Sequence, residues 1–179
     1  TEVGVGVKRE GEDKVLDFLI VRDKIPLYAL DAAYMATDKI GYIKLSRFSA
    51  TATKEVQAAI DSLTEAGMKN LILDLTGNGG GYLNQAQSLA DLFLDGEKLI
   101  VYTEGRAQPR QDFNAEEKGD FEKGRLVVMI DGSSASASEI ISGAIQDWDR
   151  GILVGRRSYG KGLVQKGYGL PDNSAVRMT

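Results

Sequence analysis

Three segments of the chain carry residues that could do covalent chemistry. Residues 134–139 (SASASE) hold three serines, residues 79–81 are consecutive glycines, and Lys161 stands between two further glycines. A serine hydroxyl can attack a carbonyl, a neutral lysine can accept the proton of that hydroxyl, and bare backbone N–H groups can hold the oxyanion that forms. Together the three segments predict a serine nucleophile with a lysine base and a backbone oxyanion hole.

The chain contains no His and no Cys among its 179 residues. These absences exclude zinc sites built on imidazole or thiolate, disulfides, cysteine nucleophiles and any Ser-His-Asp triad within the chain. Acid–base chemistry near neutral pH therefore falls to Lys, Asp, Glu or Tyr. Lys161 follows Ser136 by 25 positions (161 − 136), close enough to reach it across one helix and one strand. No metal and no cofactor are expected.

The composition is that of a globular protein, with 42% hydrophobic and 27% charged residues. Lys and Arg number 22 against 26 Asp and Glu, so the net charge is -4 and no basic excess is present to neutralise a phosphate backbone. Nucleic-acid binding is therefore disfavoured. No apolar run approaches the roughly 18 to 20 residues that a membrane span needs.

The hydrophobic pattern predicts the elements that must position these segments. Residues 1–22 alternate like a β-hairpin with its turn at 10–13. Strands are predicted at residues 40–45, 70–75, 99–102, 125–130, 152–154 and 163–168, with a further strand pattern at 174–179, and helices at 51–66, 84–94 and 140–148. Polar residues 104–124 are expected to form a long loop or lid. The repeated strand–helix order predicts an α/β layered core with a largely parallel sheet.

Two of the segments partly match nucleotide-binding motifs. Counted from Gly77, a dinucleotide fingerprint needs Gly at its sixth position, where Tyr82 stands. Residues 155–162 (GRRSYGKG) fall one residue short of a phosphate-binding loop, because Gly162 replaces the Ser or Thr that would hold magnesium. Nucleotide chemistry is therefore disfavoured. Taken alone, the glycines could form a flexible turn and Lys161 could be a solvated surface lysine.

Ser136 has two interpretations. With Glu139 it fits the capping-box spacing S-x-x-E, so it could cap the following helix. At a strand-to-helix junction it would also face free N–H groups and the positive end of the helix dipole, which favour a developing oxyanion. In the catalytic interpretation Ser133 or Ser134 would take over the capping. A neutral Lys161 would then need a site where apolar walls disfavour its charge, and a neighbouring carboxylate would oppose this.

In order and spacing, four motifs resemble those of the C-terminal processing peptidases, or tail-specific proteases, a family of Ser/Lys endopeptidases. They are residues 40–48 (IGYIKLSRF), 71–83 (LILDLTGNGGGYL), 134–147 (SASASEIISGAIQD) and 155–165 (GRRSYGKGLVQ). The resemblance implies a crotonase/ClpP-like layered fold, with Ser136 as nucleophile and Lys161 as general base. It further implies that Gln165 orients the lysine, that the backbone of Gly80 or Gly81 and of Ala137 forms the oxyanion hole, and that Asp147 has a supporting role.

Asp147 and the glycine segment need separate comment. Asp147 lies on the same helix face as Ser136 but roughly 16 Å further along the axis, so we expect it to hold the helix through Arg150 or the following loop. Thr76 stands where the family usually has Arg, and Gly79 where it often has Pro. Both departures are expected to loosen the glycine loop.

The resemblance also implies a domain organisation. Residues 1–23 are similar to the closing strands of a PDZ domain, and residues 24–179 to a protease core that stops before the family's last strands. A fragment of this kind is expected to show weak or no peptidase activity. The resemblance implies a polypeptide substrate bound through its C-terminal tail and an extracytoplasmic location in the bacterial periplasm or cell envelope, and it allows a homo-oligomer.

Three functions therefore stand as alternatives. The leading one is a serine endopeptidase that cleaves proteins near their C-termini. The second is a non-catalytic module on the same fold that binds a peptide or another ligand, against which the retention of both Ser136 and Lys161 argues. The third is a crotonase-type acyl-thioester enzyme, for which the sequence offers no clear acid–base Glu.

Overall fold

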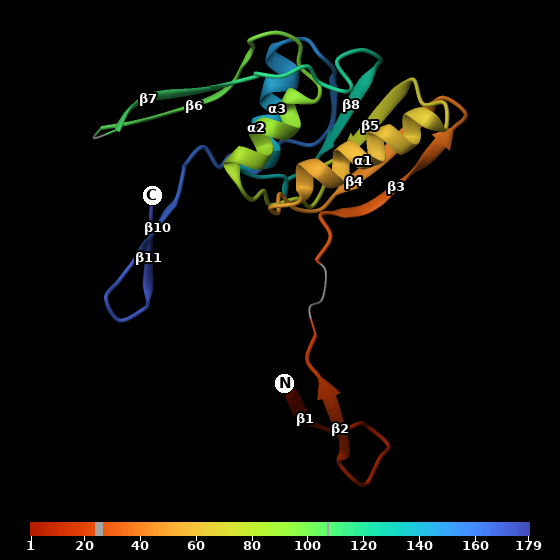
Figure 1. Ribbon diagram of the computed structural model, residues 1–179, viewed down its shortest axis with the longest axis vertical. Coiled ribbons are helices and arrows are strands. Elements are labelled where there is room, and N and C mark those ends of the chain that lie inside the picture. Colours follow the sequence, from red (N-terminus) through yellow and green to blue (C-terminus); the bar gives the residue numbers. More distant parts are fainter. Residues whose placement is uncertain (24–26, 107) are drawn as a thin grey trace.

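The computed structural model describes residues 1–23, 27–106 and 108–179. Its centre is a five-stranded sheet in the order β3-β4-β5-β8-β9 (Figure 1). The strands are β3 (Leu30–Thr37), β4 (Ile40–Leu45), β5 (Asn70–Asp74), β8 (Leu126–Ile130) and β9 (Ile152–Gly155). Strands β4, β5, β8 and β9 run parallel to one another, whereas β3 is antiparallel to β4. The sheet is therefore mixed. The predicted parallel strands extend from β4 to the edge strand β9, and the antiparallel strand β3 forms the other edge, which the sequence pattern did not predict.

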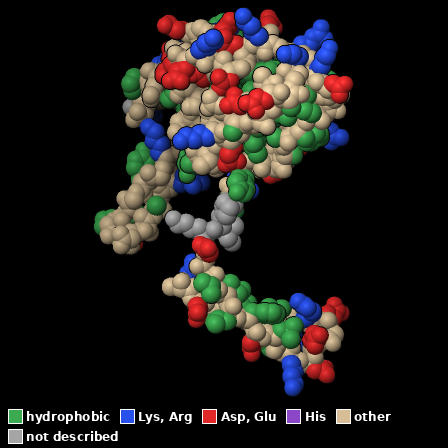
Figure 2. Space-filling view, turned by 45° about the vertical axis from the view of Figure 1, so that its right-hand side comes forward, with side chains coloured by type: hydrophobic (Ala, Val, Ile, Leu, Met, Phe, Trp, Pro, Cys, Tyr) green, Lys and Arg blue, Asp and Glu red, His purple; other side chains and the backbone are tan. Residues whose placement is uncertain are grey.

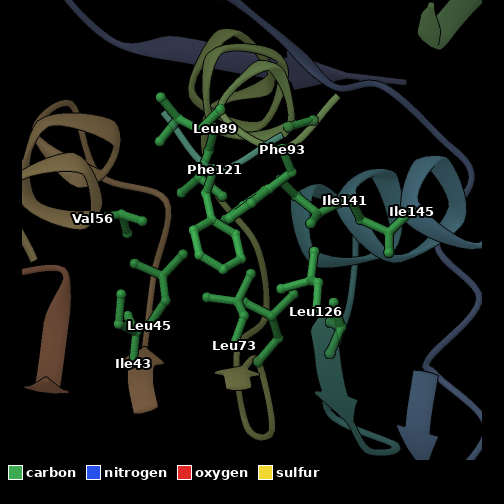
Figure 3. Close-up of a cluster of buried hydrophobic side chains, with 14 of the residues drawn as sticks. Ile43, Leu45, Val56, Leu73, Leu89, Phe93, Phe121, Leu126, Ile141 and Ile145 are labelled. Atoms are coloured by element: carbon green, nitrogen blue, oxygen red, sulfur yellow. The ribbon is translucent and has the colours of Figure 1, made fainter. Parts of the chain in front are cut away.

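Three helices cover one face of this sheet. They are α1 (Ala52–Glu65), α2 (Leu83–Asp91) and α3 (Ala137–Asp147), at the positions predicted from the 3.6-residue periodicity. Figure 3 shows side chains of all three meeting those of β4, β5 and β8 in one core: Ile43, Leu45, Val56, Leu73, Leu89, Phe93, Leu126, Ile141 and Ile145. Successive strands are therefore linked by helices packed on the same side, as the handedness of strand–helix–strand units requires.

The parallel strands determine where the candidate site forms. Because β4, β5, β8 and β9 point the same way, the segments that follow them emerge along one edge of the sheet. The glycine segment follows β5, the serine tract follows β8, and the lysine segment follows β9. The sheet thus brings together three segments that are up to 82 residues apart along the chain (161 − 79).

The predicted loop at residues 104–124 is wrong in its first half. Strands β6 (Leu99–Gly105) and β7 (Gln108–Asn114) pair as an antiparallel hairpin, which extends away from the sheet in Figure 1. The pattern did not predict β7 because the ribbon is mostly exposed on both faces, so its sequence lacks alternation. Pro109 fits this two-stranded ribbon, where edge positions need no N–H donor.

Two hairpins lie outside the central sheet. Strands β1 (Glu2–Val7) and β2 (Leu16–Val21) form the predicted N-terminal hairpin, and Figure 2 shows apolar side chains exposed over it. Strands β10 (Lys166–Gly169) and β11 (Ala175–Met178) form the other. The strand predicted at 163–168 therefore begins later and pairs with β11 instead of extending the sheet. Residues 24–26, at the predicted domain boundary, lie outside the described residues.

No described helix is both long enough and apolar enough to cross a membrane.

Candidate active site

A cavity of about 650 Å³ opens where the three loops meet. All six predicted site residues of those loops line it: Gly80, Gly81, Ser136, Ala137, Lys161 and Gln165. Its apolar walls come from Leu83, Val101, Ile140, Leu163 and Val164, of which Val101 belongs to the base of the β6–β7 hairpin. The fold thus places a hydroxyl, an amine and a glycine backbone around one space large enough for a peptide segment.

Ser136 has a strained backbone at the junction of β8 and α3. Its φ of 57° and ψ of −114° lie in a region that residues with a Cβ rarely adopt. A nucleophilic serine on a sharp strand-to-helix turn has this kind of conformation, because the turn presents the side chain at the edge of the sheet. The next residue, Ala137, begins the helix, and its N–H has no recorded acceptor within the described chain.

The Glu139 carboxylate joins the serine turn to the lysine loop. One oxygen accepts the N–H groups of Ser136 and Lys161, both at 2.8 Å. The other accepts the Ser158 hydroxyl at 2.7 Å and the Gly160 N–H at 2.6 Å. Burial acts to raise the pKa of Glu139, but hydrogen bonds led by that from Ser158 prevail and hold the pKa below its usual value. Glu139 is therefore an anion shared by both loops.

The capping box predicted for Ser136 and Glu139 is present. Ser134 does not take over this capping, because its hydroxyl donates to the Leu75 carbonyl at 2.8 Å and accepts the Asp131 N–H at 2.9 Å. Ser134 thus fixes the turn before the helix. The S-x-x-E spacing predicted the cap, but it did not predict the hydrogen bonds between Glu139 and the lysine loop.

Asn78 fixes the glycine loop against the serine turn. Its side chain donates to the Leu45 carbonyl at 2.9 Å and accepts the Gly80 N–H at 2.8 Å, while its own carbonyl accepts the Ala135 N–H at 3.0 Å. The Gly80 N–H is thereby occupied. For the Gly81 N–H, by contrast, the described residues provide no recorded acceptor.

Gly80 and Gly81 could not carry side chains here. Gly80 has a φ of +98°, and a Cβ on it would lie 2.6 Å from the Ala135 carbonyl oxygen and 2.8 Å from Ser136 Cβ. A Cβ on Gly81 would overlap the Phe48 carbonyl. Both glycines are therefore required by close backbone approach.

A polar network at the carboxyl ends of β4 and β5 secures the start of the same loop. Lys44 Nζ donates to Thr76 Oγ1 at 2.6 Å and to the Thr76 carbonyl at 2.5 Å, and it lies 3.1 Å from Asp74 Oδ1. Tyr42 donates its phenol proton to Asp74 Oδ2 at 2.6 Å. Lys44 thus tethers Thr76 at the start of the glycine loop.

Titration in this network follows from burial and charge. Burial first, and then the hydrogen bond to Asp74, raises the pKa of Tyr42 to about 12. Burial alone would raise the pKa of Asp74, but the hydrogen bonds from Tyr42, Thr76 and Lys44 lower it. Asp74 therefore stays ionised and Tyr42 stays a neutral donor at physiological pH. The sequence alone does not single out either residue, since their pairing depends on the register of β4 with β5.

Three other residues were predicted to act at the site, and the described residues do not show the contacts expected of them. Lys161 is half-buried, and no hydrogen bond between its Nζ and Ser136 Oγ is recorded among the described residues. Gln165 lines the cavity, but its recorded hydrogen bond, at 3.5 Å, goes to Thr179. Asp147 is exposed at the end of α3. Arg150 does not hold it, because the guanidinium donates to three backbone carbonyls, those of Phe93, Phe121 and Gly124.

Comparison with known proteins places this architecture among the peptidases. The model of "Peptidase family S41" matches residues 39–179. The carboxyl-terminal-processing protease of Synechocystis sp. is 37% identical over 182 aligned residues, covering 100% of this chain and 42% of that protein. The carboxy-terminal-processing protease of Bartonella bacilliformis is 40% identical over 185 residues, with 100% and 42% covered. The solved structure of a photosystem II D1 C-terminal processing protease superposes with a TM-score of 0.74 at 27% identity, covering 100% of this chain and 50% of that one.

The mixed α/β fold with its serine turn at the sheet edge defines a protein of the serine-peptidase class. More narrowly, the chain belongs to peptidase family S41. It spans 42% of the length of the two curated relatives.

The close approach at Gly80 can be tested by adding one methyl group. Gly80→Ala should lower the free energy of unfolding by about 1–3 kcal/mol, because it combines a positive φ with a backbone clash. Gly79→Ala is the matched control, since a Cβ there meets no atom within 4 Å. Urea denaturation measures both. Equal stabilities of the two variants would contradict the proposed packing of the glycine loop.

Glu139→Gln tests the shared carboxylate through its pH dependence. Because the folded-state pKa is lowered, the charge contributes stability above the unfolded pKa of about 4.3 and loses it as the pH falls through the folded value. The wild type should therefore exceed Glu139→Gln by about 1–2 kcal/mol at pH 7. This gap should close on acidification.

Chemical denaturation at a series of pH values measures the difference, with the exposed Glu97→Gln as the charge-matched control. A gap that persists unchanged into acid would show that the Glu139 carboxylate is not the group responsible.

Proposed function

We propose that this chain is the catalytic core of a serine endopeptidase that cleaves polypeptides near their C-termini, with Ser136 as nucleophile and Lys161 as general base. The observation that carries the proposal is the shared cavity, where the strained Ser136, Lys161 and the glycine loop meet in a chain without His or Cys. Membership of peptidase family S41 supports a peptidase in particular.

The proposed reaction has two halves. Neutral Lys161 Nζ accepts the proton of Ser136 Oγ as that oxygen attacks the scissile carbonyl, and the resulting ammonium then gives the proton to the leaving amine. An acyl ester on Ser136 remains. Water attacks the ester with Lys161 again as the proton acceptor, and Ser136 recovers its proton as the new carboxyl product leaves.

The Gly81 and Ala137 N–H groups are the proposed donors to the oxyanion. Both residues line the cavity, and both groups lack a recorded acceptor within the described chain. Gly80 is less suitable as a donor because its N–H is held by Asn78. Its part in the proposal is to let the loop approach Ser136 closely, so that Gly81 is presented next to the reacting carbonyl.

Substrate binding completes this arrangement in the proposed mechanism. Lys161 Nζ and Ser136 Oγ come within hydrogen-bonding distance when a peptide fills the cavity and excludes water, which also favours the neutral amine. Gln165, which lines the same wall, then orients Lys161. Asp147, at the far end of α3, has a supporting role through the helix and not through contact with substrate.

The relatives' names support a C-terminal substrate tail, since two of them are carboxyl-terminal-processing proteases. On this basis the β1–β2 hairpin is part of a PDZ domain that binds the tail. Residues 24–179 belong to the protease core, which has a crotonase/ClpP-like layering. The same relationship supports an extracytoplasmic location and is compatible with a homo-oligomer.

Substitution of the two proposed catalytic residues in the full-length protein tests the function. Ser136→Ala and Lys161→Met should each reduce kcat for a C-terminally tagged peptide by a factor of at least about 10² to 10⁴, while Lys54→Met, on the exposed face of α1, should not. Mass spectrometry of the products gives the cleavage site.

A serine-directed fluorophosphonate separates the enzyme from a binding module. Labelling at Ser136 that requires Lys161 supports the peptidase. Cleavage that persists in either variant contradicts the assignment, and a wild type that binds peptide without cleavage or labelling would identify a non-catalytic module.

A further inference from the structure

The cavity carries only positive charge. Among its lining residues, all in the described part of the chain, Lys161 and Arg177 are the charged ones, and neither Asp nor Glu is present. This contrasts with the whole chain, whose net charge is -4. Because catalysis as proposed requires Lys161 to be neutral, Arg177 is the one fixed charge of the wall.

Arg177 lies on β11, in the hairpin that follows the lysine loop. The hairpin is joined to that loop through Gln165 and Thr179, whose side chains are 3.5 Å apart. Within the described residues no acidic side chain pairs with Arg177. The acidic residue of the hairpin turn, Asp172, is already engaged by the hydroxyl of Ser174 at 2.6 Å and by its N–H at 3.0 Å.

The chemistry of the guanidinium indicates what this wall would bind. Arginine stays charged at all physiological pH values and offers a planar fork of N–H donors that matches a carboxylate with two parallel hydrogen bonds. Gly167 pairs with Arg177 across the hairpin, and Leu163 and Val164 are among the apolar residues that line the same cavity. A carboxylate entering with the substrate would therefore meet no competing anion, whereas a substrate Lys or Arg would be repelled.

We propose that Arg177 is a specificity-determining residue that binds a carboxylate of the polypeptide substrate close to the scissile bond. The inference rests on the proposed peptidase function and adds the charge of the preferred substrate. Two sources supply this chemistry, namely the terminal α-carboxylate of a short tail and the side chain of an Asp or Glu near the cleaved bond.

Two pairs of peptides with one cleavage sequence distinguish these sources in the full-length protein. The first pair ends in a free carboxylate or an amide, and the second, amidated in both members, carries Glu or Gln at one position beside the scissile bond. The wild type should cleave one carboxylate member with a kcat/KM about tenfold or more above its neutral partner. Since the contact is exposed, the preference should shrink at high salt.

Variants of the arginine decide whether this residue is the cause. Arg177→Gln should lower kcat/KM for the carboxylate member to the value for its neutral partner, and Arg177→Lys should retain part of the preference because charge remains without the fork. Arg177→Glu should reverse it and favour a peptide with Lys at the same position. The control is the exposed Arg125→Gln, directly before the first residue of β8, which removes the same charge outside the cavity.

The possible results distinguish failure of the carboxylate site from failure of the proposed peptidase function. A wild type that cleaves both members of each pair equally, or a preference that survives Arg177→Gln, overturns the carboxylate site and leaves the peptidase intact. Failure to cleave any peptide overturns the peptidase.

If no peptide is cleaved, the carboxylate site at Arg177 is tested by binding alone. Fluorescence anisotropy measures the binding of the same peptides to the Ser136→Ala variant. Equal dissociation constants for the charged and neutral members would overturn it, and a preference removed by adding Arg177→Gln would support it.

Discussion

The site depends on one carboxylate, that of Glu139, which holds two separate loops in a fixed relation. It accepts hydrogen bonds from Ser136 on one side and from Ser158, Gly160 and Lys161 on the other. Without it, the recorded backbone ties of the lysine loop are those to the carbonyls of Ile130 and Ser134. Four donors keep the group ionised, and its charge is worth more in this half-buried position than in water. The relative placement of nucleophile and base thus follows from a group that takes no part in the proposed proton transfer.

The third component, the glycine loop, is placed by similar means but through neutral groups. Asn78 joins it to both β4 and the serine turn, and Gly80 allows a backbone approach that any Cβ would block. Strain in Ser136 is tolerated because these neighbours fix the turn from two sides. The parallel sheet supplies the common edge, and a few buried polar side chains convert that edge into a site.

The hydrophobic spacing within single segments predicted the helices and strands whose burial follows that spacing. The helical spacing of Val56, Ile60 and Leu63 and the alternation in β4 located α1 and the strand correctly. Strand β3 was missed because only part of one of its faces is covered, and β7 because both of its faces are largely exposed. The spacing of Ser136 and Glu139 predicted the cap, yet the bonds of Glu139 to the lysine loop depend on how β8 and β9 align. Lys44 likewise meets Thr76 only through the pairing of β4 with β5.

The distance from Ser136 Oγ to Lys161 Nζ in a trapped complex is the most direct test of this account. A crystal structure of the full-length protein with a peptide phosphonate on Ser136 would give it. The account predicts a separation of about 3 Å, with the carboxylate of Glu139 still bonded to both loops. A lysine amine that stays well beyond hydrogen-bonding distance in the occupied site, with another group against the serine oxygen, would contradict it.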